Sequence, residues 1–191
     1  MDTYQAVSGT GGKAVAELET QVRAHVAGTP KVPVVYPHPI AFNALPEIDV
    51  FLENGYTKEE WKVVTESRKI LHLPDLRVSC TAVRVPVLMS HSEAVHVETS
   101  EPITPAAARE RFAEIPGVVV LDEPAAHVYP LATEAAGSDD IFVGRVRTDP
   151  SVPGGRGLAF WVVADNIRKG AALNAVELAE ILVEREWVKA A

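Results

Sequence analysis

The sequence lacks several features that would place it in a functional class directly. It has one cysteine in 191 residues, which rules out an internal disulfide framework and a structural zinc site built on cysteine. Acidic residues outnumber basic ones by 26 to 18, giving a formal net charge of -8. Because the chain is acidic and has no basic run with interleaved aromatic residues, we expect no nucleic-acid partner.

Long apolar stretches are also missing. No run reaches the roughly 18 apolar residues that a membrane-spanning helix needs, so no membrane partner is expected. The residues from Met1 to Gln5 have neither the basic start nor the apolar segment of a signal peptide. A single cysteine without a signal peptide favours a reducing, cytoplasmic location.

The composition that remains is that of an ordinary globular domain, with 47% hydrophobic and 23% charged residues. Helices are predicted by apolar residues at helical spacing and by start signals such as the Thr57–Glu60 capping box and Thr104-Pro105. Strands are predicted by alternating apolar residues or by short apolar runs. The spacing predicts helices at 13–27, 58–71, 105–115 and 171–187, and strands at 83–88, 95–97, 117–121, 141–147 and 158–164. Residues 29–49 are proline-rich and irregular, and 122–140 form a long acidic loop. Because strands and helices do not alternate regularly, the prediction is an α+β fold with a mixed, largely antiparallel sheet and helices on one face.

Arg84 and His91 stand at the polar end of an apolar run. On one continuous strand, their separation of seven residues would put them on opposite faces and roughly 23 Å apart. The polar residues Ser90–Ser92 interrupt the run, which predicts a bend that lets both side chains face one site. A guanidinium suits a carboxylate and an imidazole suits proton transfer. The alternative is an arginine in solvent and a histidine with a structural role.

Three further features each allow more than one interpretation. Glu59 and Lys62 lie three residues apart on the helix predicted at 58–71, either as an exposed ion pair or as two opposite charges offered to a zwitterionic or phosphorylated ligand. The glycines before the helix at 13–27 suggest a phosphate cradle, but the GxGxxG and GxxxxGK[ST] patterns are missing. Cys80 is best interpreted as a small buried apolar residue.

Five segments, in order along the chain, resemble the carboxy-terminal half of aspartate-semialdehyde dehydrogenase. They are Tyr4–Gly9, Pro39–Asn43, Asn54–Glu60, Arg84–Val87 with His91–Glu93, and Asp165–Asn174. The resemblance covers essentially the whole chain. It implies a catalytic and dimerisation domain similar to that of glyceraldehyde-3-phosphate dehydrogenase. It also implies an amino-terminal NADP-binding domain, carrying the catalytic cysteine, that this chain does not contain. Cys80 does not match that cysteine.

The resemblance also implies a function. The family interconverts L-aspartyl 4-phosphate and L-aspartate 4-semialdehyde plus phosphate with NADPH, in the biosynthesis of lysine, threonine and methionine. It implies an acid/base role for His91, with Arg84 on the substrate carboxylate and Glu59 on the ammonium group. The resemblance further implies that Lys62 binds phosphate and that Gln5 contacts the substrate. It also implies that a minor part of the cofactor site is formed by Ser8, Gly9 and Asn166. The resemblance implies a homodimer, and no metal is expected.

The resemblance divides the chain into three parts. Residues 1–12 are expected to be a loop that follows the cofactor domain, 13–164 the catalytic and dimerisation domain, and 165–191 a helix that packs on the cofactor domain. Because nucleophile and nucleotide fold are both missing, we expect no activity from this chain alone. Two alternatives remain: a self-associating interaction module that has lost catalysis, and a relative of N-acetyl-glutamyl-phosphate reductase. The amine contact assigned to Glu59 is a weak argument against the second.

Overall fold

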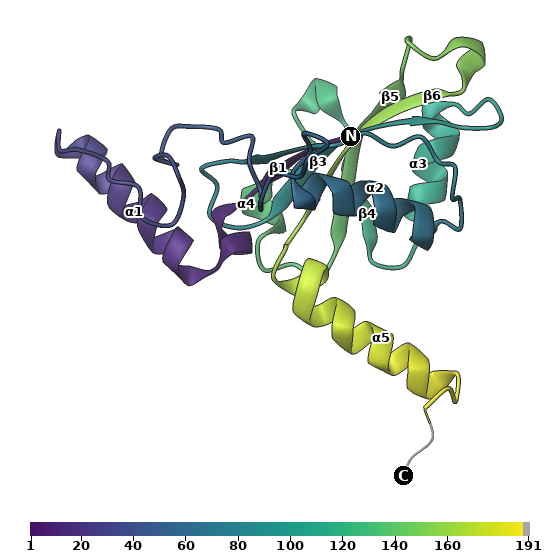
Figure 1. Ribbon diagram of the computed structural model, residues 1–191. Coiled ribbons are helices and arrows are strands. Elements are labelled where there is room, and N and C mark those ends of the chain that lie inside the picture. Colours follow the sequence, from purple (N-terminus) through teal and green to yellow (C-terminus); the bar gives the residue numbers. More distant parts are fainter. Residues whose placement is uncertain (189–191) are drawn as a thin grey trace.

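A computed structural model describes residues 1–188, and a single mixed sheet organises them (Figure 1). Its strands run in the order β2-β1-β3-β6-β5-β4. The pairs β1–β3, β3–β6 and β5–β6 are antiparallel, whereas β1–β2 and β4–β5 are parallel. This confirms the predicted α+β class with a largely antiparallel sheet. The strands are β1 Asp2–Gln5, β2 Thr81–Arg84, β3 His91–Glu98, β4 Val118–Val120, β5 Ile141–Thr148 and β6 Gly157–Ala164.

Two helices begin at their predicted capping signals. The Thr57 side chain accepts the Glu60 N–H at 3.3 Å, and the Glu60 carboxylate accepts the Thr57 N–H at 2.7 Å, so the predicted capping box is formed. The Thr104 hydroxyl oxygen caps the next helix by accepting the Ala107 N–H at 3.2 Å, with Pro105 at the first position. The helices are α1 Gly12–Val26, α2 Lys58–Ile70, α3 Pro105–Ala113, α4 Ala132–Ala135 and α5 Leu173–Glu184.

The expected loop at 1–12 is wrong in its first part, because residues Asp2–Gln5 form β1 inside the sheet. Four residues are too few to show an alternation in the sequence, and neighbouring strands supply the pattern instead. β1 pairs with β2 on one side and β3 on the other. The chain then turns through a 3₁₀ segment at Val7–Thr10, where Val7 and Ser8 donate their N–H groups to the carbonyl oxygens of Val87 and Leu88.

The buried apolar side chains form two clusters. One joins α1 to the irregular segment after it, and the other lies between α3 and strands β3, β5 and β6. The first contains Val7, Ala14, Leu18, Ile40, Ala41 and Leu45, and the second Ala108, Val143, Val146 and Leu158. Several apolar residues of α1 and of α2 with its C-terminal end are exposed, although their helical spacing would suit a buried face: Val22, Val26, Trp61, Ile70 and Leu71. The predicted acidic loop at 122–140 contains the short helix α4.

Helices α1 and α5 extend away from the sheet in Figure 1. A π-helical turn at Arg168–Ala172 precedes α5, which ends at Glu184 rather than at Trp187. The apolar residues of α5 stay exposed: Val176, Leu178, Ile181, Leu182 and Val183. Within residues 1–188, no helix has the length and apolar character needed to cross a membrane.

Candidate functional site

Arg84 and His91 come together beside the backbone of Gly9. β2 ends at Arg84 and β3 begins at His91, and the chain reverses between them with Ser90 at a φ of 72°. A Cβ atom placed on Gly9 would lie 2.9 Å from Arg84 Nη1 and 3.0 Å from His91 Nε2. The predicted bend is therefore confirmed, and the three residues leave no space for a side chain at position 9.

The His91 ring is held in one tautomer. The backbone N–H of Ala6 donates to His91 Nδ1 at 3.0 Å, so Nδ1 must be an acceptor and the neutral ring carries its proton on Nε2. Burial, and next the positive charge of Arg84, lower the pKa of His91 to about 4. At neutral pH the side chain is an uncharged imidazole whose Nε2–H lies next to Gly9.

The Arg84 guanidinium is buried without an acidic partner. Its exposed fraction is 5%, and its Nη1 donates to the Ala6 carbonyl oxygen at 2.7 Å. Its Nε makes no hydrogen bond within the described residues. Burial lowers the pKa of Arg84, although an arginine stays charged at neutral pH. A buried cation that has spare N–H donors and no carboxylate partner suits a planar anion that enters from outside.

These residues lie in a cleft of about 640 Å³ whose wall includes Glu59 and Lys62 at the start of α2. Seven of the eight predicted site residues line it: Gln5, Gly9, Glu59, Lys62, Arg84, His91 and Asn166. The eighth, Ser8, is hydrogen-bonded to Asn166 Oδ1 at 3.0 Å. Sequence reasoning missed four other polar residues of the lining: Thr10, Asp49, Glu93 and Asp165.

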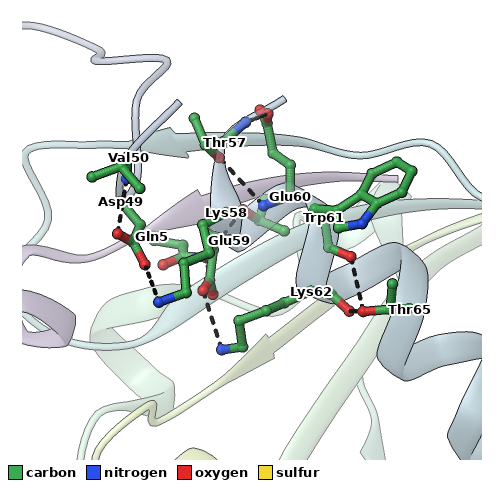
Figure 2. A network of polar contacts seen from close by, with 11 residues as sticks. Gln5, Asp49, Val50, Thr57, Lys58, Glu59, Glu60, Trp61, Lys62 and Thr65 are labelled. Atoms are coloured by element: carbon green, nitrogen blue, oxygen red, sulfur yellow. Dashed lines mark hydrogen bonds and ion pairs between the residues drawn. The ribbon is translucent and has the colours of Figure 1, made fainter. Parts of the chain in front are cut away.

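The start of α2 brings opposite charges to the cleft (Figure 2). Lys62 Nζ lies 3.3 Å from Glu59 Oε2, and Gln5 Nε2 is 3.4 Å from the other carboxylate oxygen of Glu59. Glu59 and Lys62 thus form a partly exposed ion pair, which was the first interpretation of their spacing. Both side chains also line the cleft, which the second interpretation, two charges offered to a ligand, required. An exposed pair of this kind contributes little to stability, so its two charges remain open to exchange for those of a ligand.

Asn166 is fixed in the wall of the cleft by its neighbours. Its Oδ1 accepts the Ser90 N–H at 3.0 Å in addition to the Ser8 hydroxyl. The preceding Asp165 is buried and accepts the backbone N–H groups of Gly137, Ile167 and Arg168. These hydrogen bonds lower the pKa of Asp165 against the opposing effect of burial. The turn that carries Asn166 therefore has a defined geometry, and the amide Nδ2 has no hydrogen bond within the described residues.

Glu93 follows His91 by two residues on β3, so both side chains leave the sheet on the same face. It lines the cleft, and burial raises its pKa to about 7. The signal available in the sequence was this spacing of two within a strand. It was not sufficient, because an acid in an alternating strand usually points to solvent.

Other parts of the chain offer less chemistry. Among residues 1–188, no cluster of three or more His, Cys, Asp or Glu side chains is arranged to hold a metal ion. Cys80 is buried, and burial raises the pKa of its thiol to about 11, which fits the interpretation as an unreactive apolar residue. A second hollow of about 620 Å³ includes Tyr129, Arg145, Arg147 and Trp161, and no predicted site residue lines it.

Comparison with known proteins gives a consistent result. A family profile described as "Semialdehyde dehydrogenase, dimerisation domain" matches residues 1–169. The aspartate-semialdehyde dehydrogenase of Aquifex aeolicus (strain VF5) is 52% identical over 186 residues, which are 96% of this chain and 54% of that protein. That of Legionella pneumophila is 55% identical over 187 residues, 97% of this chain and 53% of the relative.

Solved structures agree with the sequence matches. The crystal structure of aspartate semialdehyde dehydrogenase II complexed with ASA from Vibrio cholerae has a TM-score of 0.90 and 44% identity, covering 96% of this chain and 53% of that one. A Candida albicans aspartate semialdehyde dehydrogenase with NADP is 21% identical with a TM-score of 0.68, a likeness of fold. The chain spans about half the length of the curated relatives it matches.

Proposed function

Because the chain belongs to the semialdehyde dehydrogenase family and contains its dimerisation domain, we propose that it is the substrate-binding and proton-transfer half of an aspartate-semialdehyde dehydrogenase. The full-length protein would interconvert L-aspartyl 4-phosphate and L-aspartate 4-semialdehyde plus phosphate with NADPH, as a cytoplasmic enzyme of amino-acid biosynthesis. The observation that carries the proposal is the buried Arg84 guanidinium, without a carboxylate partner, next to the Nε2–H of His91.

Arg84 would bind the α-carboxylate of the substrate. Its Nη1 is held by the Ala6 carbonyl oxygen, so the side chain is already ordered before a ligand arrives. A preorganised guanidinium loses little conformational entropy on binding, and its fork of N–H donors matches a carboxylate. The cost of keeping an unpaired cation buried is recovered when the carboxylate enters.

His91 would act on the oxygen of the reacting carbonyl group. Its Nε2–H is the side of the ring not used by the Ala6 N–H, and it lies next to Gly9 in the cleft wall. A fixed donor of this kind stabilises negative charge that develops on an oxygen as a nucleophile adds to the carbonyl carbon. The acid/base role that the resemblance assigns to His91 thus takes the form of an N–H presented to that oxygen.

Glu59, Lys62 and Gln5 would bind the remaining charged groups. The Glu59 carboxylate suits the ammonium group of the substrate, and the Lys62 ammonium suits phosphate. In the ligand-free cleft the two neutralise each other at 3.3 Å, and each would exchange its partner for a substrate group. Gln5 is hydrogen-bonded to Glu59 and would orient it.

The cofactor would be NADP, which supplies or accepts the hydride when it is bound. Ser8, Gly9 and Asn166 fit a minor part of its site. The lack of a side chain at Gly9 permits a close approach, and the Asn166 amide offers a donor at the cleft wall. The exposed apolar residues of α5 would pack on the domain that holds the rest of the cofactor.

A homodimer is also part of the proposal. Tyr4 precedes the cleft residue Gln5 on β1 and so points to the opposite face of the sheet, where its ring centroid lies 5.5 Å from that of Trp161, a residue that also lines the second hollow. Tyr4 is one-third exposed or more, so an aromatic surface remains uncovered there. Such a surface on a sheet suits a self-complementary contact between two copies.

The test is phosphate-dependent NADP reduction by aspartate semialdehyde in the full-length protein. Arg84→Ala should lower kcat/KM by a factor of roughly 100 or more, because a carboxylate in a closed site loses its charged partner. Arg77→Ala is the matched control, since Arg77 is highly exposed and pairs with Glu98 outside the cleft. A loss below twofold for Arg84→Ala would remove Arg84 from the substrate site, and activity of the 191-residue chain alone would contradict the assignment of the nucleophile to another domain.

A further inference from the structure

A tyrosine from the segment that follows α1 reaches the edge of the cleft. α1 extends away from the sheet in Figure 1, and residues 29–45 pack back on it. From this segment the Tyr36 hydroxyl donates to Thr10 Oγ1 at 2.9 Å. Thr10 lines the cleft and ends the 3₁₀ segment that contains Gly9. The hydrogen bond therefore connects α1 and its partner segment to the cleft wall.

Two buried polar side chains of α1 fix the segment that carries Tyr36. The Glu17 carboxylate accepts the N–H of Val35, the residue before Tyr36. Gln21 Oε1 accepts the N–H groups of residues 40 and 41 at 2.8 and 3.0 Å, and Gln21 Nε2 donates to Glu17 at 2.9 Å. The exposed fractions of Glu17 and Gln21 are 6% and 2%, so water does not compete for these hydrogen bonds. A buried and connected network of this kind holds its members in one arrangement.

The body of the Tyr36 side chain is fixed as well. Its ring packs against the apolar cluster that contains Val7 and Ile40. Burial lowers the pKa of Arg84 and an ionised Tyr36 would raise it, so the phenol oxygen lies within electrostatic reach of the guanidinium. A tyrosine with a packed ring and a hydrogen-bonded hydroxyl joins the two segments that it contacts.

The 3₁₀ segment Val7–Thr10 is held at both of its ends. The N–H groups of its first two residues donate to the carbonyl oxygens of residues 87 and 88 at 2.9 and 3.2 Å. At the other end, Thr10 has no side-chain hydrogen bond within residues 1–188 except the one with Tyr36. Gly9 lies between these two points, so the Tyr36 hydroxyl limits how far its backbone can move.

We infer that Tyr36 is a positioning residue for cofactor binding, whose hydroxyl holds Thr10 and thereby keeps the Gly9 backbone where the cofactor approaches it. The inference rests on the proposed function, in which Ser8 and Gly9 form a minor part of the NADP site. Tyr36 acts through Thr10 and touches no reacting atom. Without the hydroxyl the segment is ordered only when the cofactor binds, and that loss of conformational entropy weakens the affinity.

The first test measures the affinity for the cofactor without turnover. In the full-length protein, fluorescence titration gives the dissociation constant of NADPH, and Tyr36→Phe should raise it about 3- to 10-fold, as expected for the loss of one neutral hydrogen bond. The kcat value and the KM for the aldehyde should stay within about twofold of wild type. The matched control is Tyr56→Phe, because the Tyr56 hydroxyl lies 3.5 Å from the Ser79 hydroxyl and Tyr56 does not line the cleft. This control should bind NADPH like wild type.

The second test asks whether the effect passes through Thr10. Thr10→Val removes the same hydrogen bond from the other side and should raise the dissociation constant to a similar extent. The double variant with Tyr36→Phe should then be no weaker than either single variant, because both lose one shared interaction. Thr10→Ser keeps the hydroxyl and should restore wild-type affinity. Additive losses in the double variant would overturn the inference, because the two hydroxyls would then act separately.

A third measurement follows the segment in the absence of cofactor. The amide N–H groups of Gly9 and Gly11 close turns within and just after the 3₁₀ segment. In the ligand-free full-length protein, Tyr36→Phe should speed the hydrogen exchange of these two amides about 3- to 10-fold and leave that of Val7 unchanged. An equal increase throughout α1 and the 3₁₀ segment would make Tyr36 a general stabiliser of this region and overturn the positioning role.

The outcomes separate this inference from the proposed function. A wild-type protein that does not bind NADPH would contradict the proposed function. If wild type binds NADPH and Tyr36→Phe binds it equally well, only the positioning role is overturned. A rise in the KM for the aldehyde alone would make Tyr36 a substrate-contacting residue and also overturn that role. If Tyr36→Phe does not fold, as judged by circular dichroism, Thr10→Val keeps the ring in place, and unchanged NADPH affinity in that variant overturns the inference.

Discussion

Position 9 permits a sharp test of the cleft, because the change is a single carbon atom. In Gly9→Ala the new Cβ would lie 2.9 Å from Arg84 Nη1 and 3.0 Å from both His91 Cε1 and Nε2. Comfortable contacts between such atoms lie near 3.5 Å or more, so the neighbours must move by roughly 0.5 Å. Neither side chain moves freely, since Arg84 is held by the Ala6 carbonyl oxygen and His91 by the Ala6 N–H.

Two magnitudes follow from this displacement. Overpacking of a closely packed site costs about 1–3 kcal/mol in the free energy of unfolding, and each kcal/mol lowers the Tm of a domain of this size by about 2–4 °C. A 1 Å displacement of catalytic groups costs about 10²-fold in rate, so half of that distance predicts a loss of about tenfold in kcat/KM.

The assay is kcat/KM of the full-length protein together with Tm by calorimetry. Gly170→Ala is a matched control, because Gly170 also lines the cleft and its new Cβ would meet no atom nearer than 4.0 Å. We expect the control to keep kcat/KM within about twofold. If Gly9→Ala matches Gly170→Ala in both kcat/KM and Tm, the close packing of Arg84 and His91 against Gly9 does not determine the geometry of the site.

Two further predictions concern stability. Thr57→Ala removes the completely buried capping hydroxyl of α2 and should lower the free energy of unfolding, measured by chemical denaturation, by about 0.5–2 kcal/mol. The control Thr65→Ala, on the exposed side of the same helix, should lower it by less. Equal losses for the two variants would contradict the capping role. The second prediction concerns Glu93, whose pKa is about 7 in the folded protein and about 4.3 in the unfolded chain. Because the folded state favours the protonated carboxyl group, the contribution of Glu93 to the free energy of unfolding is complete below pH 4 and is lost as the pH rises through 7. Glu93→Gln should therefore gain stability relative to wild type by up to about 3 kcal/mol between pH 4 and 8, measured by urea unfolding at each pH. If the stability difference between Glu93→Gln and wild type does not change with pH, the pKa of Glu93 is not raised in the folded protein.

Local signals in the sequence were sufficient for much of the secondary structure. Thr57 and Thr104 mark the starts of α2 and α3 because a capping hydroxyl acts on backbone N–H groups only two or three residues away. Strands β5 and β6 were also readable, since each is 8 residues long and their apolar side chains pack in one cluster. The site residues other than Ser8 lie around one cleft as the resemblance implied, although their roles remain proposals.

The exposed apolar residues of α1, α2 and α5 show where periodicity is not enough. A spacing of three and four residues indicates which side chains share a helix face, but it does not say whether anything covers that face. Val26 and Ile70 are therefore periodic and exposed, and α5 is apolar with no cover among the described residues.

Three features depend on contacts between segments far apart in the chain. β1 exists because β2 and β3, some 80 to 90 residues later, supply its hydrogen-bond partners. The proton of His91 is on Nε2 because the backbone N–H of Ala6 reaches Nδ1 across the fold. Glu93 is partly buried because the sheet places it beside Val162 in the cleft wall. A sequence pattern records which groups are present, but pairing and burial are properties of the folded chain, and these set the hydrogen bonds and pKa values on which the proposed chemistry depends.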